Sequence, residues 1–141
     1  MTTFVLDNSV AMRWLLESDM PADQKYAIAT LESLQNATAL VPTLWHLDAA
    51  NVLLGARNKG RLSVADVERF VSQLHVLPIQ ADALTSQQAF GSTLSLAHAY
   101  QLSSYDAAYL ELALREGIPL ATLDKDLLKA ARKARVAIYL K

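Results

Sequence analysis

Four aspartates are the residues of this sequence best suited to chemistry: Asp7, Asp48, Asp106 and Asp124. None of them has a basic partner at helical spacing. Carboxylates packed side by side repel one another, so their charge must be relieved by protons or by a cation. Oxygen ligands in a cluster suit Mg²⁺ or Mn²⁺. If the fold brings these side chains together, the sequence predicts metal-dependent chemistry on a phosphorylated substrate.

Two of the aspartates follow short apolar runs, and each has a structural alternative. Asp7 and Asp124 could both be helix N-caps, accepting hydrogen bonds from backbone N–H groups. Thr122 lies two residues before Asp124, on the same side of an extended chain, and could orient it by hydrogen bonding. Asp126 is a weaker candidate, better explained as a favourable charge in the first turn of a helix.

The other two aspartates lie on or beside apolar helix faces. An ionised group at Asp48 is costly there unless something satisfies it, and a structural hydrogen bond through Asn51 is the alternative. Asp106 lies three residues after Ser103, which matches a capping box and would explain this aspartate without chemistry. Each alternative is reasonable for one residue alone, but the four aspartates together favour a functional site.

The elements that must position these residues alternate between strands and helices. Short apolar runs predict strands, and a 3.6-residue periodicity with capping and glycine stop signals predicts helices. Strands separated by helices imply right-handed crossovers and a parallel sheet covered on both faces. We therefore expect an α/β fold: a three-layer α/β/α sandwich with a central, mostly parallel sheet of about five short strands. The expected strands cover residues 3–6, 39–41, 76–79, 118–123 and 136–140, and the expected helices cover 10–16, 22–36, 43–58, 63–74, 83–100, 104–116 and 125–133.

Composition narrows the class of protein. The 141 residues, without linker or repeat, suit one domain covering residues 1–141. The absence of cysteine excludes disulfides and cysteine-ligated zinc, and no signal peptide or membrane span is expected, so we predict a cytoplasmic protein. The formal net charge of −1 gives no general attraction to nucleic acid. Basic residues nevertheless gather in two groups, which are solvated surfaces or phosphate contacts: Arg57, Lys59 and Arg61, and Lys125, Lys129, Arg132, Lys133, Arg135 and Lys141.

Other chemistries find less support. The sequence has no glycine-rich phosphate loop and no serine nucleophile elbow. The three histidines, His46, His75 and His98, match no zinc pattern, which favours structural roles. One apolar group is expected in the core, although part of it could form a groove for a partner helix: Trp14, Leu15, Leu16, Tyr26 and Ile28.

Four segments of the chain carry a resemblance to a known family. They are FVLDNSVA at residues 4–11, VPTLWHLDAANVL at 41–53, LSSYDAAYLELA at 102–113 and LATLDKDL at 120–127. In this order they resemble PIN-domain ribonucleases, and most of all the VapC-type toxins of bacterial type II toxin–antitoxin systems. The resemblance covers essentially the whole chain, and the last two segments are its most specific part.

The resemblance implies a PIN-like fold, Mg²⁺- or Mn²⁺-dependent endoribonuclease activity, dimerisation, and inhibition by a cognate antitoxin protein whose tail fills the acidic site. By motif position, Asp7, Asp48, Asp106 and Asp124 take the acidic places of the family, with Thr122 and Ser9 supporting them. The sequence departs from the family pattern at Asp48, where the usual residue is glutamate. The shorter side chain implies a water-bridged contact to the ion or a lower metal affinity.

The resulting hypothesis is hydrolysis of RNA phosphodiester bonds. Asp7 and Asp106 would hold one divalent ion most directly, while Asp124 and Asp48 would complete the site or recruit a second ion. The ion would activate water and neutralise phosphoryl charge, and the two basic groups could hold flanking phosphates. The main rival is a catalytically weakened PIN-fold binding module that acts through a protein partner, which the shortened Asp48 favours. A response-regulator phosphoacceptor domain is a further rival, but its paired acids after the first strand are missing.

Overall fold

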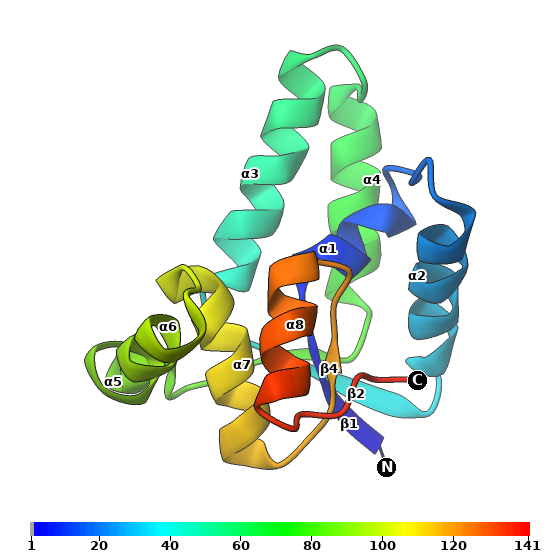
Figure 1. Ribbon diagram of the computed structural model, residues 1–141. Helices are drawn as coiled ribbons and strands as arrows, with labels where there is room; N and C mark the ends of the chain where they lie inside the picture. Colours follow the sequence, from blue (N-terminus) through cyan, green and yellow to red (C-terminus); the bar gives the residue numbers. More distant parts are fainter. Residues whose placement is uncertain (1) are drawn as a thin grey trace.

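Four parallel strands form the centre of the molecule, in the order β3-β2-β1-β4 (Figure 1). The computed structural model describes residues 2–141. Strand β1 lies between β2 and β4, and β2 also pairs with β3, always in parallel. The strands are short: β1 is Thr2–Leu6, β2 is Ala37–Val41, β3 is Ile79–Ala81 and β4 is Leu120–Ala121.

The predicted fifth strand at residues 136–140 is reduced to a single parallel bridge between Leu120 and Ile138. The segment cannot continue as a strand, because Leu140 has a left-handed backbone with φ of 63°. Strand β3 begins directly after Pro78, three residues later than predicted, because proline has no N–H to give to a sheet.

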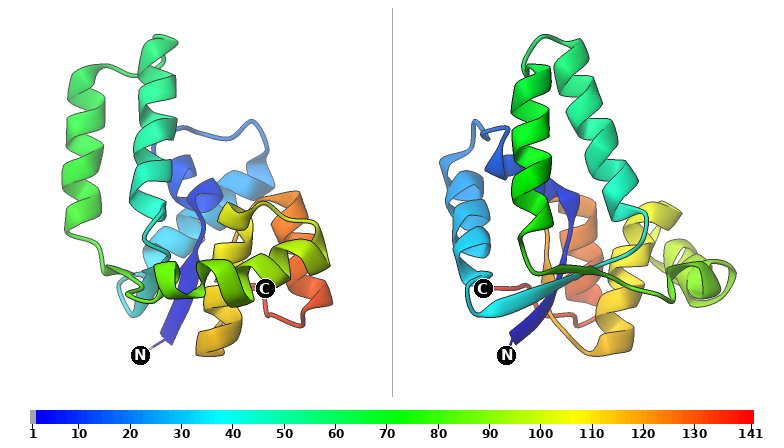
Figure 2. Two further views of the ribbon diagram at one scale, coloured as in Figure 1. Left: turned by 90° about the vertical axis from the view of Figure 1, so that its left-hand side faces the viewer. Right: turned by 180° about the vertical axis from the view of Figure 1, so that it is seen from behind.

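Helices cover both faces of the sheet, which confirms the three-layer α/β fold. Helix α2 lies on one side of the strands, and α7 and α8 lie on the other; α3 and α4 extend as an antiparallel pair beyond the rest (Figures 1 and 2). Among residues 2–141, no helix is both long enough and apolar enough to span a membrane. The helices are α1 Asn8–Ala11, the 3₁₀ turn η1 Met12–Trp14, α2 Pro21–Ser33, α3 Trp45–Asn58, α4 Val64–His75, α5 Thr85–Gln88, the π turn η2 Ala89–Thr93, α6 Leu94–Tyr100, α7 Ser104–Glu116 and α8 Lys125–Lys133.

Local signals explain where several helices begin and end. The capping box before α4 is formed: the Ser63 hydroxyl accepts from the Asp66 N–H, and the Asp66 carboxylate accepts from the Ser63 N–H. Helix α7 stops at Gly117, whose φ of 65° suits glycine. Both α7 and α8 have the predicted bounds.

Two helix predictions were wrong. The long helix expected at 83–100 is divided into α5, η2 and α6, because Gly91 has non-helical backbone angles (φ −104°, ψ −107°). The helix expected at 10–16 is only the short α1, starting at residue 8, followed by η1.

The core is built around β1. Phe4, Val5 and Leu6 are completely buried, and the Phe4 ring stacks on Tyr139 with 3.8 Å between centroids. Of the apolar group that could have been core or groove, four members pack into or against the core, which confirms the core prediction for Trp14, Leu15, Leu16 and Tyr26. Ile28 is the exception, since 38% of it is exposed.

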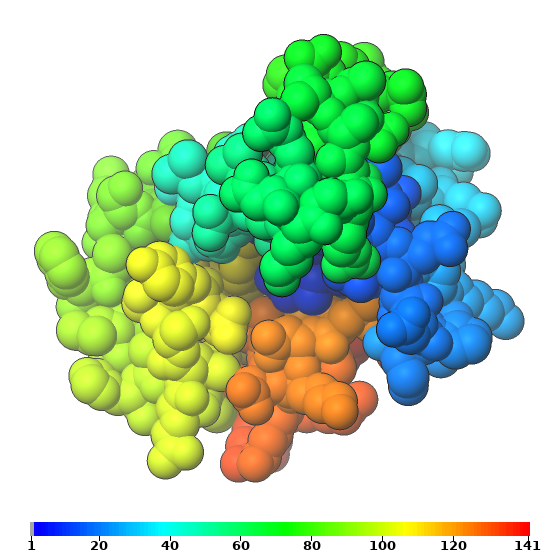
Figure 3. Space-filling view, turned by 90° about the horizontal axis from the view of Figure 1, so that it is seen from above, coloured from blue at the N-terminus to red at the C-terminus, as the bar shows by residue number. Residues whose placement is uncertain are grey.

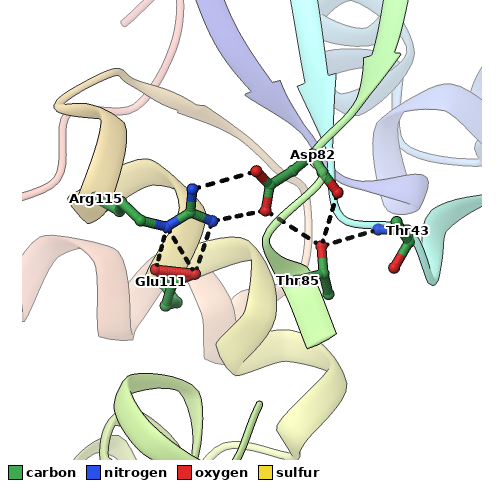
Figure 4. Close-up of polar contacts among 5 residues, drawn as sticks. All are labelled: Thr43, Asp82, Thr85, Glu111 and Arg115. Carbon is green, nitrogen blue, oxygen red and sulfur yellow. Dashed lines mark hydrogen bonds and ion pairs between the residues drawn. The ribbon is translucent and has the colours of Figure 1, made fainter. Parts of the chain in front are cut away.

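A charged cluster joins the end of β3 to α7 (Figure 4). The Arg115 guanidinium donates to both carboxylate oxygens of Asp82, at 2.6 and 3.2 Å, and its Nε donates to Glu111 at 2.8 Å. Thr85 donates to Asp82 and accepts from the Thr43 N–H, so the loop after β2 is tied in as well. The cluster therefore fixes α7 against the loops at one edge of the sheet.

Arg115 stabilises two carboxylates that have little contact with water. The Asp82 and Glu111 side chains are 8% and 5% exposed. Burial alone would raise the pKa of Asp82, but the hydrogen bonds and charge of Arg115 outweigh it and lower that pKa. The hydrogen bonds from Arg115 to Glu111 and Asp82 in turn raise the pKa of the guanidinium.

We expect Arg115→Ala to destabilise the protein by about 3–5 kcal/mol, because it leaves two buried carboxylates without a cation. Urea unfolding at pH 7 measures this loss. The control is Arg69→Ala, which removes an exposed ion pair with Asp66 and should leave the unfolding midpoint almost unchanged. Equal stability of the two variants would contradict a stabilising role for the cluster.

Candidate functional site

The carboxyl ends of the parallel strands lie at one edge of the sheet, and the aspartates gather there. Asp7 directly follows β1, and Asp124 comes three residues after β4. Helices α3 and α7 begin at the same edge, with Asp48 and Asp106 in their first turns. Viewed from above this edge, the segment where β1 ends and α1 begins (dark blue) lies in a hollow between α3 (green) and α8 (orange) (Figure 3). Ligands bind at this edge in open α/β sheets.

Asp7 is the most tightly held of the four. It is only 6% exposed, and its Oδ2 accepts hydrogen bonds from the hydroxyls of Ser9 at 2.6 Å and Thr122 at 2.7 Å. These hydroxyls in turn accept from backbone N–H groups, Ser9 from Leu123 and Thr122 from Asp124. The backbone after β4 therefore fixes both hydroxyls, and the hydroxyls fix the carboxylate.

Two predictions about these residues need correction. Asp7 occupies the N-cap position of α1, but its side chain makes no capping hydrogen bond. Thr122 was expected to orient the side chain of Asp124; it donates to Asp7 instead and contacts only the Asp124 backbone. The reason is geometric, because β1 and β4 are adjacent parallel strands and their ends face each other directly.

The Asp106 carboxylate takes no part in capping α7. The Ser103 hydroxyl accepts from the Asp106 N–H at 3.1 Å, but the carboxylate makes no return bond, so only half of the expected capping box exists. Loss of hydration, followed by the charges of Asp124, Asp7, Asp126 and Asp48, raises the pKa of Asp106 to about 6. That carboxyl group therefore lies in the field of every other candidate.

The remaining candidates occupy different positions around this centre. Asp124 is the N-cap of α8, where Oδ1 accepts from the Leu127 N–H at 3.0 Å, so its capping alternative is confirmed. Asp48 makes no hydrogen bond to Asn51, and burial alone raises its pKa. Burial also raises the pKa of Asp7, only partly offset by the bonds from Ser9 and Thr122, and the charge of Asp124 adds to the effect. Asp126 is exposed at the start of α8.

Within the described part of the chain, none of the four aspartates forms an ion pair; the ion pairs found join Arg69 to Asp66 and Arg115 to Asp82 and Glu111. Nor do any three aspartate, glutamate or histidine side chains of residues 2–141 form a group that could hold a metal ion. The acids thus share one electrostatic neighbourhood without a closed ligand set.

Sequence reasoning missed three contributors. Asn8 donates from Nδ2 to the Trp45 carbonyl at 3.1 Å and thereby ties the end of β1 to the start of α3. The Tyr109 hydroxyl, one turn after Asp106, is buried without a hydrogen-bond partner among residues 2–141, and burial together with nearby aspartates raises its pKa. Asp82 also ends a strand at this edge, but Arg115 neutralises it. No periodicity or motif signals the contacts of Asn8 and Asp82, because they join residues far apart in the sequence.

The comparison with protein-family models decides the family. The model described as "PIN domain" matches residues 4–133, almost the whole chain. The protein belongs to the PIN domain family. PIN domains are typically metal-dependent nucleases, which agrees with an uncompensated carboxylate cluster at the edge of the sheet. A search of curated proteins finds no match.

Solved structures with the same fold support the assignment. PAE2754 from Pyrobaculum aerophilum superposes with a TM-score of 0.63 and 22% identity, covering 92% of this chain and 86% of the other. FitAcB from Neisseria gonorrhoeae superposes with a TM-score of 0.58 and 18% identity, covering 96% of each chain. At such low identity, the likeness establishes the fold of this PIN domain and not its substrate.

The raised pKa of Asp106 makes the stability of the metal-free protein depend on pH. In the unfolded chain this group titrates near 3.8 and in the folded protein near 6, so the folded state loses stability as pH rises through this window. We expect Asp106→Asn to be more stable than wild type at pH 7.5, by on the order of 1 kcal/mol after allowance for solvent screening, and no more stable at pH 3.5.

Urea unfolding in EDTA at both pH values tests this expectation. Asp66→Asn is a control of opposite sign, because the capping hydrogen bonds with Ser63 lower the pKa of Asp66. That variant should lose stability at pH 7.5 relative to wild type. A constant difference between Asp106→Asn and wild type across the pH range would refute the raised pKa.

Proposed function

We propose that this PIN domain is a Mg²⁺- or Mn²⁺-dependent endoribonuclease and the toxin of a VapC-type toxin–antitoxin pair. One observation carries the proposal. The Asp106 carboxylate lies near the ends of the parallel strands, in the field of four other aspartates, and has no basic partner within residues 2–141. A divalent cation would relieve that repulsion, and RNA supplies phosphate groups that such ions bind.

The chemistry of the donors fits a hard cation, because all of them are carboxylates. Asp7 and Asp106 would hold the ion most directly, and Asp124 and Asp48 would complete the site. When bound, the ion supplies an activated water and neutralises charge on the phosphoryl oxygens. Ser9 and Thr122 act on the carboxylate instead, because their hydrogen bonds hold Oδ2 of Asp7 in one orientation before any ligand arrives.

The proposed partners follow from the family resemblance. A cognate antitoxin protein would block the acidic site, and the chain would act as a homodimer. Two exposed apolar side chains support a protein contact: Phe90 is 93% exposed and Leu47 is 78% exposed. Cytoplasmic location remains part of the same proposal, as does the extent of the domain over the whole chain.

RNA cleavage tests the proposal directly. With Mn²⁺, the wild type should cleave single-stranded RNA, and Asp7→Asn should lower the rate by more than about a hundredfold, because it removes a carboxylate from the site. Thr122→Ala should lower it by about 10–100-fold through loss of orientation. The matched control is Asp19→Asn, an isosteric change at an exposed loop position, which should keep the wild-type rate. Equal rates for wild type and Asp7→Asn, or no wild-type cleavage across varied RNA substrates, would overturn the proposal.

The alternative is a PIN-fold binding module with a weakened metal site. Two features favour it: the shortened acid at Asp48, and the absence of a three-residue ligand group within residues 2–141. In that case the protein would act through its partner alone.

Metal-dependent stability separates the two functions. If the site binds Mn²⁺, an ion concentration of about 100 times Kd should stabilise the fold by about 2.7 kcal/mol, and Asp106→Asn should abolish the gain. Asp48→Glu adds the methylene that the family pattern has, so it should lower the Kd for Mn²⁺ in calorimetry. A wild type with no thermal shift at millimolar Mn²⁺ would favour the binding module.

A further inference from the structure

A pocket next to the acidic centre has the side chains expected of a nucleotide site. It lies between the end of α6, with Tyr100 and Gln101, and the exposed side of α8, with Asp126, Lys129 and Lys133. Its volume of about 360 Å³ is at the lower end of the range for small-molecule sites, roughly 300–1,000 Å³. Such a space can hold one nucleotide but not several nucleotides of an RNA chain.

Helix α8 links the pocket to the acidic centre. Asp126 lies on the wall of the pocket and also within the electrostatic reach of Asp106. Lys129 follows one turn later and Lys133 one further turn along, about 6 Å apart along the helix axis, so all three share one side of α8. The pocket therefore changes from acidic at the end near the catalytic candidates to basic at the far end.

Gln101 contributes an unusual backbone position. Its φ of 56° is in the left-handed region, which ends α6 and which glycine or asparagine usually occupies. Gln101 also lines the pocket, so a glutamine there can offer an amide to a ligand.

We propose that this pocket binds one nucleotide of single-stranded RNA beside the phosphate that is cleaved. Lys129 and Lys133 contact backbone phosphates, the Tyr100 ring stacks on the base, and the Gln101 amide bonds to the edge of the base. Phosphate contacts position the strand without reading sequence, whereas stacking and edge contacts are how single-stranded RNA is read. The inference rests on the proposed ribonuclease function and adds to it a site for substrate selection.

RNA binding by the full chain tests the pocket separately from cleavage. Fluorescence anisotropy with a short fluorescein-labelled single-stranded RNA, in EDTA so that no cleavage occurs, gives affinity and its salt dependence. Lys129→Ala and Lys133→Ala should each weaken binding about 3–10-fold and lower the slope of log K against log salt by about 0.7. Tyr100 is half-buried and also packs against the core, so the informative change is Tyr100→Leu, which keeps apolar volume, removes the aromatic face and should weaken binding about tenfold. Lys25→Ala, an exposed lysine on α2, is the matched control and should match wild type.

The Gln101→Gly variant tests whether the glutamine side chain contributes to discrimination between bases. Glycine accepts the left-handed backbone, so the variant should fold at least as well as wild type while losing the amide. We expect wild type to discriminate among RNAs that differ in one base, and Gln101→Gly to reduce that discrimination with little change in mean affinity. RNA that contains 4-thiouridine should form a photo-crosslink to the peptide that carries Tyr100.

The outcomes distinguish this inference from the proposed function. Cleavage by wild type, with RNA affinity and salt slope unchanged in both lysine variants, would overturn the pocket and leave the nuclease standing. Lysine-dependent RNA binding without any cleavage would support the pocket and overturn the nuclease. If the lysine variants keep RNA affinity and lose only affinity for a protein partner, the pocket is a protein interface and the inference fails.

Discussion

Repulsion among carboxylates held at one edge of a parallel sheet is the constraint on which this structure depends. Parallel strands place all their carboxyl ends together, so any acid that follows a strand is brought near the others. The scaffold resists the repulsion because its parts are fixed independently. Phe4, Val5 and Leu6 of β1 are completely buried, Arg115 ties α7 to the end of β3, and Thr85 ties the same cluster to the loop after β2. The same edge carries Asp82, which a bidentate guanidinium neutralises, and Asp106, which has no cation within the described residues. At this edge, the negative charge of Asp82 is therefore neutralised, whereas that of Asp106 is not.

Topology brings the acids to one edge of the sheet, but hydrogen bonds orient their side chains. Asp7 is held through hydroxyls that are themselves held by backbone N–H groups, and such a chain tolerates little rotation of the carboxylate. Asp106 and Asp48 have no such restraint within the described residues. Asp7 is therefore the acid at this edge whose side chain is held by two hydroxyls, while no three acidic or histidine side chains among residues 2–141 form a group that could hold a metal ion.

Sequence reasoning predicted helix ends and the order of strands well, but it missed one helix break and the long-range side-chain contacts. The bounds of α7 and α8 were predicted because Ser103, Gly117 and Asp124 act within one turn of the helix ends. The helix expected at 83–100 was wrong because one residue, Gly91, interrupts a periodicity that spans it. The placement of Asp7 and Asp124 at one edge of the sheet followed from topology, since each comes after a parallel strand, whereas Asp48 and Asp106 lie there in the first turns of helices. The hydrogen bond from Thr122 to Asp7 could not be predicted in this way, because it depends on how β1 and β4 are paired, and no spacing within either segment shows that pairing.

The distribution of charge on α8 connects the acidic site to substrate binding. A protein with a net charge of −1 cannot attract RNA by its overall field, so any attraction must be local. Helix α8 provides this locally: Asp124 and Asp126 lie in or before its first turn, where the helix dipole favours negative charge, and Lys129 and Lys133 follow on one side. The same placement stabilises the helix and creates a gradient from acid to base along its surface. Under the proposed nuclease function, RNA whose phosphates contact these lysines would extend toward the carboxylates, where a divalent cation would offset the charge of the next phosphate.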